Sequence, residues 1–161
     1  MKLGVRKTIK EIKDYGKYYL VQSLLASLVI GIALLISGMH HLVIVASIGS
    51  TAFIVFMTPQ KRIARPKNII GGHLIGFFSG AFCAFFVPPH SESVVMYALA
   101  VGISMFFMAL TDTRHPPASG TALGIAISGF SWDVFFCLLI GVVALSLAHV
   151  LFRNVIKDFS Q

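Results

Sequence analysis

The residues with the most evident chemistry lie together in one short polar stretch of an otherwise apolar sequence. This stretch begins with an acid, a guanidinium and an imidazole, and it runs Asp112–Thr113–Arg114–His115–Pro116–Pro117–Ala118–Ser119–Gly120–Thr121–Ala122–Leu123. Two consecutive prolines prevent a helix from running through them, but proline is favoured at a helix start. We therefore expect a helix to begin at Pro117 or Ala118. Its free N–H groups and the hydroxyls of Ser119 and Thr121, with Gly120 between them, would bind an anion.

A second polar stretch, 46–52, contains Gly49, Ser50 and Thr51. Its hydroxyls and backbone would face the same anion, to which His115 or Arg114 would add positive charge. The alternative is that the small residues only allow helices to pack closely, with Arg114 at the lipid headgroups.

His115 follows Arg114 and precedes a helix N-terminus, and both neighbours are positive. We expect its pKa to be lowered, so that the imidazole is neutral at pH 7 and takes up a proton when an anion binds. The alternative is that His115 only caps the double proline by bonding a nearby carbonyl.

Enzyme chemistry is the weaker interpretation. Asp112 and His115 would be an acid–base pair, but no nucleophile accompanies them, and the six histidines show no metal-ligand spacing beyond the His40–His41 pair. We therefore expect no catalytic residue, no metal and no cofactor.

Composition indicates a membrane protein. Of 161 residues 57% are hydrophobic and 12% are charged, against about 25% charged residues in soluble domains. The charged residues are separated by long uncharged segments of the kind that span a bilayer. The net charge of +7 is carried by loops and tails beside these segments, so we expect lipid headgroups and not nucleic acid as its partner.

The expected fold is an all-α polytopic membrane protein with about six transmembrane segments. A basic N-terminal segment, 1–17, would lie on the cytoplasmic membrane surface as a short amphipathic helix. The transmembrane domain would cover 18–153, and a cytoplasmic tail 154–161. The predicted spans are 18–38, 42–57, 69–87, 94–111, 118–130 and 134–152.

Topology follows from the positive-inside rule. With six crossings both termini are cytoplasmic and every Lys and Arg lies on that side, whereas a re-entrant hairpin at 118–130 would place two basic residues outside. The segment 118–130 is short for a crossing, so we expect non-helical chain buried in protein to complete it.

The two polar stretches resemble each other. His40–His41 precedes Gly49–Ser50–Thr51–Ala52, and His115 precedes Ser119–Gly120–Thr121–Ala122. Three crossings per unit would invert the second unit in the membrane, with short or broken helices 2 and 5. Two inverted three-helix repeats are typical of transporters.

Two motifs together resemble the HPP family of integral membrane proteins. The first is His115–Pro116–Pro117 with its small residues, and the second is Arg65–Pro66–Lys67–Asn68, followed by Gly72–His73. The second departs from the family pattern at Arg65, where Gln is usual, and at Lys67, where Arg is usual. The resemblance implies a multi-helix membrane domain, and plant and cyanobacterial members are associated with nitrite transport.

The leading hypothesis is a transporter or channel-like facilitator for a small anion, for example nitrite, bound between helix N-termini near the membrane midplane. The alternative is a non-catalytic assembly subunit of a larger membrane complex. We expect a prokaryotic inner membrane location and a homo-oligomer, because six short crossings offer few helices to enclose a pathway. We assign substrate binding to His115, Ser119, Gly120, Thr121, Gly49, Ser50, Thr51 and Arg114. Structural roles in the motifs are assigned to Pro116, Pro117, Asp112, Arg65, Pro66, Asn68, Gly72 and His73.

Overall fold

The computed structural model describes residues 2–37, 42–87 and 93–159, and the regular secondary structure of these residues is entirely helical. The predicted all-α class is confirmed. His40 and His41, the first half of the predicted repeat signature, lie outside the described residues. The elements are α1 (Lys2–Ser37), α2 (Leu42–Met57), the 3-10 turn η1 (Arg62–Ala64), α3 (Pro66–Phe85), α4 (Val94–Leu110), α5 (Pro117–Ser128) and α6 (Trp132–Phe152).

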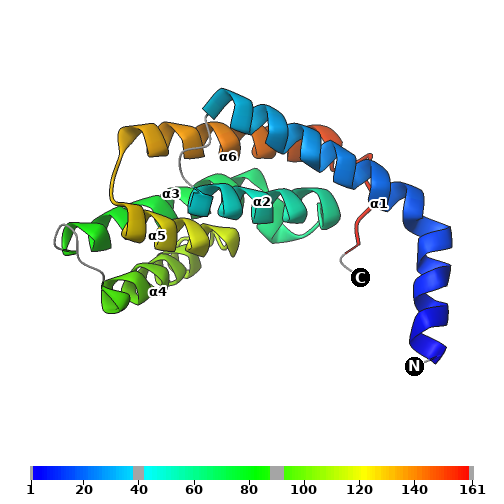
Figure 1. Cartoon of the computed structure of the whole chain (residues 1–161), viewed down its shortest axis with the longest axis horizontal. Helices are drawn as coiled ribbons and strands as arrows, with labels where there is room; N and C mark the ends of the chain where they lie inside the picture. The colour runs from blue at the N-terminus through cyan, green and yellow to red at the C-terminus, as the bar shows by residue number, and fades with distance from the viewer. Residues whose placement is uncertain (1, 38–41, 88–92, 160–161) are drawn as a thin grey trace.

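The helices form an up-and-down bundle in which each runs opposite to the one before it (Figure 1). α1 and α6 lie along one side, α4 lies on the other, and α2, α3 and α5 lie between them. The chain therefore passes from one end of the bundle to the other at every helix, including the short α5. The twelve residues of α5 make about 18 Å of helix, and extended chain at Ser131 leads on to α6.

The two halves of the chain make equivalent helix pairings. α1 packs on α2 and α6, and correspondingly α4 packs on α5 and α3. α2 packs on α6 as α5 packs on α3, and the remaining pairs, α2 with α5 and α3 with α6, join equivalent helices. This pattern is unchanged when the first three helices are exchanged with the last three. With the alternating directions of Figure 1, it is the arrangement that an inverted repeat produces.

Two helix starts follow directly from proline. α5 begins at Pro117, as predicted. α3 begins at Pro66, three residues before the predicted start, because proline is favoured at the first helical position and holds the preceding Arg65 in extended conformation. Its N-terminal motif is therefore part of the helix.

α1 differs from the expectation of two separate segments. It is one continuous helix of 36 residues, so the predicted surface helix at 1–17 and the first span are a single element. Figure 1 shows its first turns bending away from the bundle.

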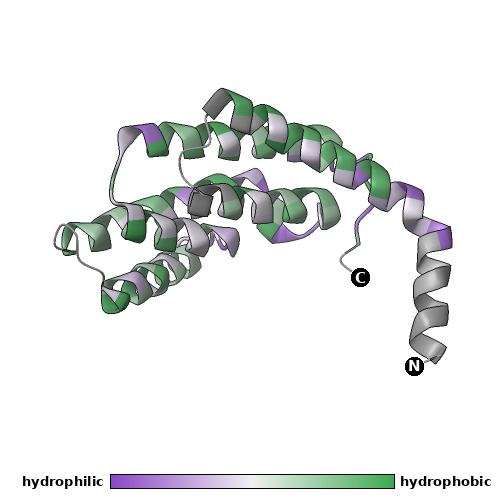
Figure 2. Cartoon of the chain, viewed as in Figure 1, coloured by the Kyte–Doolittle hydropathy of each residue, from purple (hydrophilic) through white to green (hydrophobic). Residues whose placement is uncertain are grey.

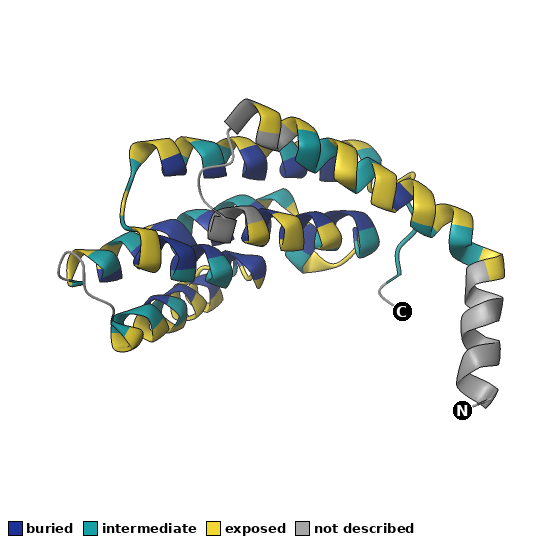
Figure 3. Ribbon diagram, viewed as in Figure 1, coloured by how far each residue is buried: buried dark blue, intermediate teal, exposed yellow. Residues whose placement is uncertain are grey.

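Glycines on α3 bring its backbone close to α5. A Cβ atom added at Gly76 would lie 2.3 Å from the Ala118 carbonyl oxygen, and one at Gly80 would lie 2.4 Å from that of Ala122. These small residues of α3 thus pack against α5 inside the bundle. Figure 3 shows the result, with buried faces gathered where α2, α3, α5 and α6 meet.

Polar residues gather at the end of the bundle that holds η1 and the α4–α5 turn (Figure 2). The α5–α6 turn at the other end contains no Lys or Arg. Two described helices, α3 and α6, are long and apolar enough to cross a membrane on their own, while α2 and α4 are shorter apolar helices.

Candidate functional site

Two histidines from the two sequence motifs meet inside the bundle. His73, on α3, and His115, in the turn before α5, are each 1% exposed, and their ring centroids lie 5.1 Å apart. The hydroxyl of Thr51, on α2, lies 2.9 Å from Nε2 of each ring. His73 is therefore an interior residue, because α5 and the turn before it cover the first turns of α3.

The second nitrogen of each imidazole also has a partner. Nδ1 of His73 lies 2.8 Å from the hydroxyl of Thr121, which lies 2.9 Å from that of Ser47. Nδ1 of His115 lies 2.7 Å from the carbonyl oxygen of Ile63. We call this set the buried polar chain: Ser47, Thr121, His73, Thr51, His115 and the Ile63 carbonyl.

The two threonines occupy matching places in the predicted repeats. Each precedes an alanine in a run of small residues, Thr51 on α2 and Thr121 on α5. Their hydroxyls contact opposite nitrogens of His73. The polar interior is thus built from equivalent positions of the two halves.

The direction of the hydrogen bonds follows from the Ile63 carbonyl, which can only accept. Nδ1 of His115 therefore carries a hydrogen, and Nε2 of the neutral ring accepts from the Thr51 hydroxyl. That hydroxyl also lies 3.0 Å from the Ser47 carbonyl oxygen, but this carbonyl already accepts the helical bond from the Thr51 N–H. His115 is thus the acceptor that depends on the Thr51 hydrogen.

The remaining bonds run in the same direction. Since the Thr51 hydroxyl has given its only hydrogen to His115, its oxygen accepts from Nε2 of His73. Nδ1 of the neutral His73 ring then accepts from the Thr121 hydroxyl, whose oxygen accepts from Ser47. Every polar atom between Thr121 and Ile63 is satisfied with both imidazoles neutral.

Burial lowers the pKa of His115 to about 4, and the bond to the Ile63 carbonyl opposes this shift. The direction is the one expected from the sequence, but the main cause is loss of solvation and not the positive neighbours. Capping by a nearby carbonyl, the alternative role considered for His115, is also present, since Ile63 supplies that carbonyl.

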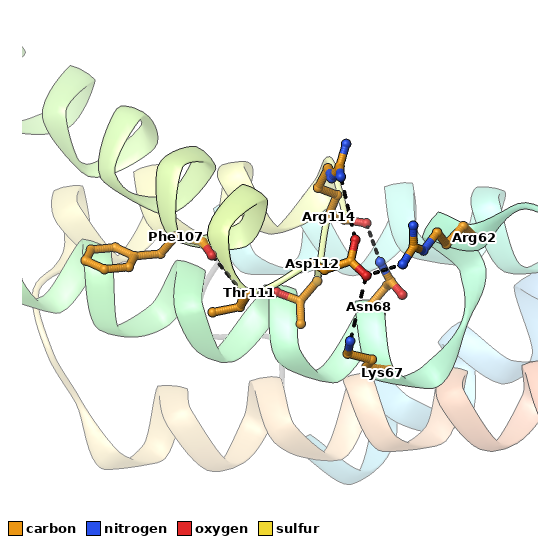
Figure 4. A network of polar contacts seen from close by, with 8 residues as sticks. Arg62, Lys67, Asn68, Phe107, Thr111, Asp112 and Arg114 are labelled. Carbon is orange, nitrogen blue, oxygen red and sulfur yellow. Dashed lines mark hydrogen bonds and ion pairs between the residues drawn. The ribbon is translucent and has the colours of Figure 1, made fainter.

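Asp112 terminates α4 in a left-handed conformation, with φ of 55°. The N–H of Thr113 donates to the Met108 carbonyl across this residue at 3.0 Å, a bond characteristic of a Schellman helix end. The Asp112 carboxylate then faces three cations (Figure 4). They are Arg62, Lys67 at 3.9 Å and Arg114 at 3.6 Å.

Asp112 and His115 have different partners in different parts of the bundle. The carboxylate is paired with exposed cations at the bundle end, while His115 bonds Thr51 and Ile63 in the interior. The acid–base pair considered from the sequence is therefore not assembled. Arg114 is exposed, as its headgroup interpretation requires.

Residues of the second motif, at the start of α3, hold the first motif, in the turn before α5, in place. The Asn68 side-chain amide donates to the Arg114 carbonyl oxygen at 3.0 Å (Figure 4). A Cβ atom at Gly72 would lie 2.8 Å from Cβ of His115, so only glycine fits there without movement. The Arg65 carbonyl accepts the N–H groups of Asn68 and Ile69 at the start of α3. These motif residues thus hold the α4–α5 turn against α3.

A groove of about 560 Å³ lies between α2 and α5. Its lining includes Ala46, Ser47, Ser50, Pro116, Pro117 and Gly120, and no lining residue is acidic. Ser50 is exposed, and its hydroxyl donates to the Ala46 carbonyl at 3.2 Å. Ser47 belongs both to the groove and to the buried polar chain.

Two further residues predicted to bind the anion, Gly49 and Ser119, are not among those that line the groove. Gly49 is exposed in open space, and Ser119 is half-buried. The N–H groups of Ala118 and Ser119 donate to the carbonyls of His115 and Pro116, so these two expected donors at the start of α5 are not free. The polar side chains that line the groove are the hydroxyls of Ser47 and Ser50.

Sequence reasoning missed Ser47, Arg62 and the Ile63 carbonyl. Ser47 precedes Thr51 by one helical turn, and this spacing was the available signal. Arg62 and Ile63 gave no signal, because their roles come from the fold of η1 against the α4–α5 turn. Within the described ranges no group of three His, Cys, Asp or Glu side chains is placed to hold a metal ion.

Comparison with known proteins agrees with the two motifs. Residues 15–160 match the family described as HPP, transmembrane region. A transmembrane protein of Dictyostelium discoideum is 30% identical over 122 residues, which cover 74% of this chain and 42% of that protein. Another from the same organism is 28% identical over 120 residues, covering 73% and 39%.

The chain spans about two fifths of the length of these relatives. No solved structure matches it. The family match extends over nearly the whole described bundle and includes both halves of the buried polar chain. This chain therefore belongs to the HPP family of transmembrane proteins.

Proposed function

We propose that the protein transports a small anion across the membrane, with nitrite as the first candidate, and that the anion binds in the groove between α2 and α5. The observation that carries this proposal is the groove itself, which places the Ser47 and Ser50 hydroxyls between two short antiparallel helices of the repeats. Hydroxyl donors without a neighbouring carboxylate favour an anion over a cation.

Charge at one end of the bundle supports the same choice. Pro116 lines the groove and follows Arg114 by two residues. Arg62 and Lys67 contact the carboxylate of Asp112, close to Arg114. Three cations share this one carboxylate, so the surplus charge is positive and attracts anions toward the groove. The site differs from that expected, because it lies between the first turns of α5 and the middle of α2 and not between two N-termini.

Flux into proteoliposomes of purified protein tests the proposal, with nitrite, nitrate, formate and chloride supplied separately. We expect flux of at least one anion, and Ser50→Ala to weaken its apparent affinity about 2- to 12-fold, the loss of one hydrogen bond. Ser128→Ala is the matched control, because Ser128 also donates to the carbonyl four residues before it but lies outside the groove. Absence of flux for every anion would favour the assembly-subunit alternative.

Orientation and assembly belong to the same proposal. We infer that the basic end is cytoplasmic in a prokaryotic inner membrane, which follows the positive-inside rule. Phe53 on the groove wall is 63% exposed, so the groove is open on one side and a second copy would close it. The Ser131→Cys variant should react with a membrane-impermeant thiol reagent from outside, and the Lys61→Cys variant should not.

A further inference from the structure

Between Thr121 and Ile63, the buried polar chain has one hydrogen for each hydrogen bond. The four bonds from Thr121 to His73, to Thr51, to His115 and to the Ile63 carbonyl use the hydrogens of two hydroxyls and two neutral imidazoles. Ile63 holds one end, because a carbonyl cannot reverse its role. No hydrogen is therefore left over to serve a further acceptor at the other end.

The other end reaches the groove. Ser47 lines it, and its hydroxyl lies 2.9 Å from that of Thr121. An anion that accepts the Ser47 hydrogen turns the Ser47 oxygen into an acceptor for Thr121. The Thr121 hydrogen then leaves Nδ1 of His73, and that nitrogen must carry a hydrogen of its own to keep its bond to the Thr121 oxygen.

We propose that an anion in the groove draws one proton into the buried polar chain, so that anion and proton bind together and the transport is proton-coupled. This inference rests on the proposed function. The proton comes from solvent and adds to Nδ1 of His73, whose Nε2–H remains bonded to Thr51. The negative charge of the anion and the positive charge of the imidazolium compensate each other across three hydrogen bonds, through the hydroxyls of Ser47 and Thr121.

Uptake is limited to one proton. The two imidazole centroids lie 5.1 Å apart in an interior where charges are weakly screened, so both rings do not hold a positive charge at once. The hydroxyl of Thr51 touches both rings, so the added proton can pass between them: His73 gives its Nε2 hydrogen to Thr51, which gives its own to Nε2 of His115. In both positions the chain holds the same single charge.

The neighbouring elements supply no other ionisable group in contact with the rings, as far as the described residues go. α2 presents hydroxyls, α5 presents Thr121, and α6 presents an apolar wall of Phe135, Leu138, Leu139 and Val142. The cations Arg62, Lys67 and Arg114 are exposed and paired with Asp112. His149, farther along α6, bonds the Pro59 carbonyl. Anion-linked protonation is therefore assigned to the two rings of the chain.

Isothermal titration calorimetry of nitrite, or of whichever anion of the panel is transported, measures the coupling directly. The number of protons taken up per anion follows from the binding heat in buffers of different ionisation enthalpy. We expect about one proton, and an affinity that tightens up to tenfold for each pH unit lowered between pH 8 and 6. In proteoliposomes, an internal pH dye should report acidification that accompanies anion entry.

Thr121→Val removes the hydroxyl that connects the groove to His73 and should leave less than a twofold pH dependence. Thr58→Val is the matched control, because the Thr58 hydroxyl bonds the Ile54 carbonyl and is not part of the buried polar chain; this variant should preserve the full dependence. Anion flux without proton uptake, or an equal pH dependence in wild type and Thr121→Val, would overturn the coupling and leave the proposed function standing. Absence of both binding and flux for every anion would overturn the two together.

Discussion

Replacing Thr51 by valine is the sharpest test of the buried polar chain. Valine has nearly the same shape, so packing is retained, but both imidazoles lose the partner of Nε2 at a residue that is 0% exposed. The His73 N–H and the bare His115 nitrogen would each remain buried without a hydrogen bond.

The expected size follows from the number of bonds lost. An unsatisfied buried group costs about 1–3 kcal/mol in soluble proteins. Interhelical hydrogen bonds in membranes contribute less, about 0.6 kcal/mol on average and up to about 1.7, because the unfolded chain also finds partners in lipid. With two bonds lost, we expect the free energy of unfolding to fall by about 1–3 kcal/mol.

Unfolding by SDS in mixed micelles, followed by far-UV circular dichroism, measures this change. Thr58→Val, one residue beyond the end of α2, loses one half-buried hydroxyl bond to a backbone carbonyl and should cost less than about 0.5 kcal/mol. If the two variants unfold within 0.5 kcal/mol of each other, Thr51 does not hold the histidines together and the chain as described is wrong.

Two further predictions concern packing and pH. Gly76→Ala should separate α3 from α5 and destabilise the bundle by about 1–3 kcal/mol. Gly102→Ala should not, because a Cβ atom there meets open space. Equal midpoints of SDS unfolding for the two variants would contradict the packing. The pKa of His115 falls from about 6.5 in the unfolded chain to about 4 on folding, so the unfolded state binds its proton first. The free energy of unfolding should thus be unaffected by this group above pH 6.5 and should fall by about 3 kcal/mol as pH drops to 4. A His115→Gln variant should show a shallower fall, and identical pH profiles of the two proteins would refute this assignment.

The amino-acid sequence by itself determined the class of the protein. Long uncharged segments can bury their backbone in lipid only as helices, so the all-α fold and most helix positions could be read from composition and proline. Pro117 marked the start of α5 because proline restricts only its local backbone. The resemblance between the two polar stretches likewise indicated two halves, which the helix pairings match.

Only the tertiary structure decided which polar groups meet. His73 and His115 lie 42 positions apart in the sequence, and Thr51 stands on a third helix, so no local pattern places one hydroxyl between two rings. That contact exists because Gly72 and Gly76 let α5 and its preceding turn approach the backbone of α3. The direction of the hydrogen bonds in the buried polar chain could not be predicted from the sequence either. It depends on the Ile63 carbonyl, and a backbone carbonyl has no sequence signature. Residue types determine the local conformation, whereas the buried polar chain depends on the distances between helices, which only the packed bundle sets.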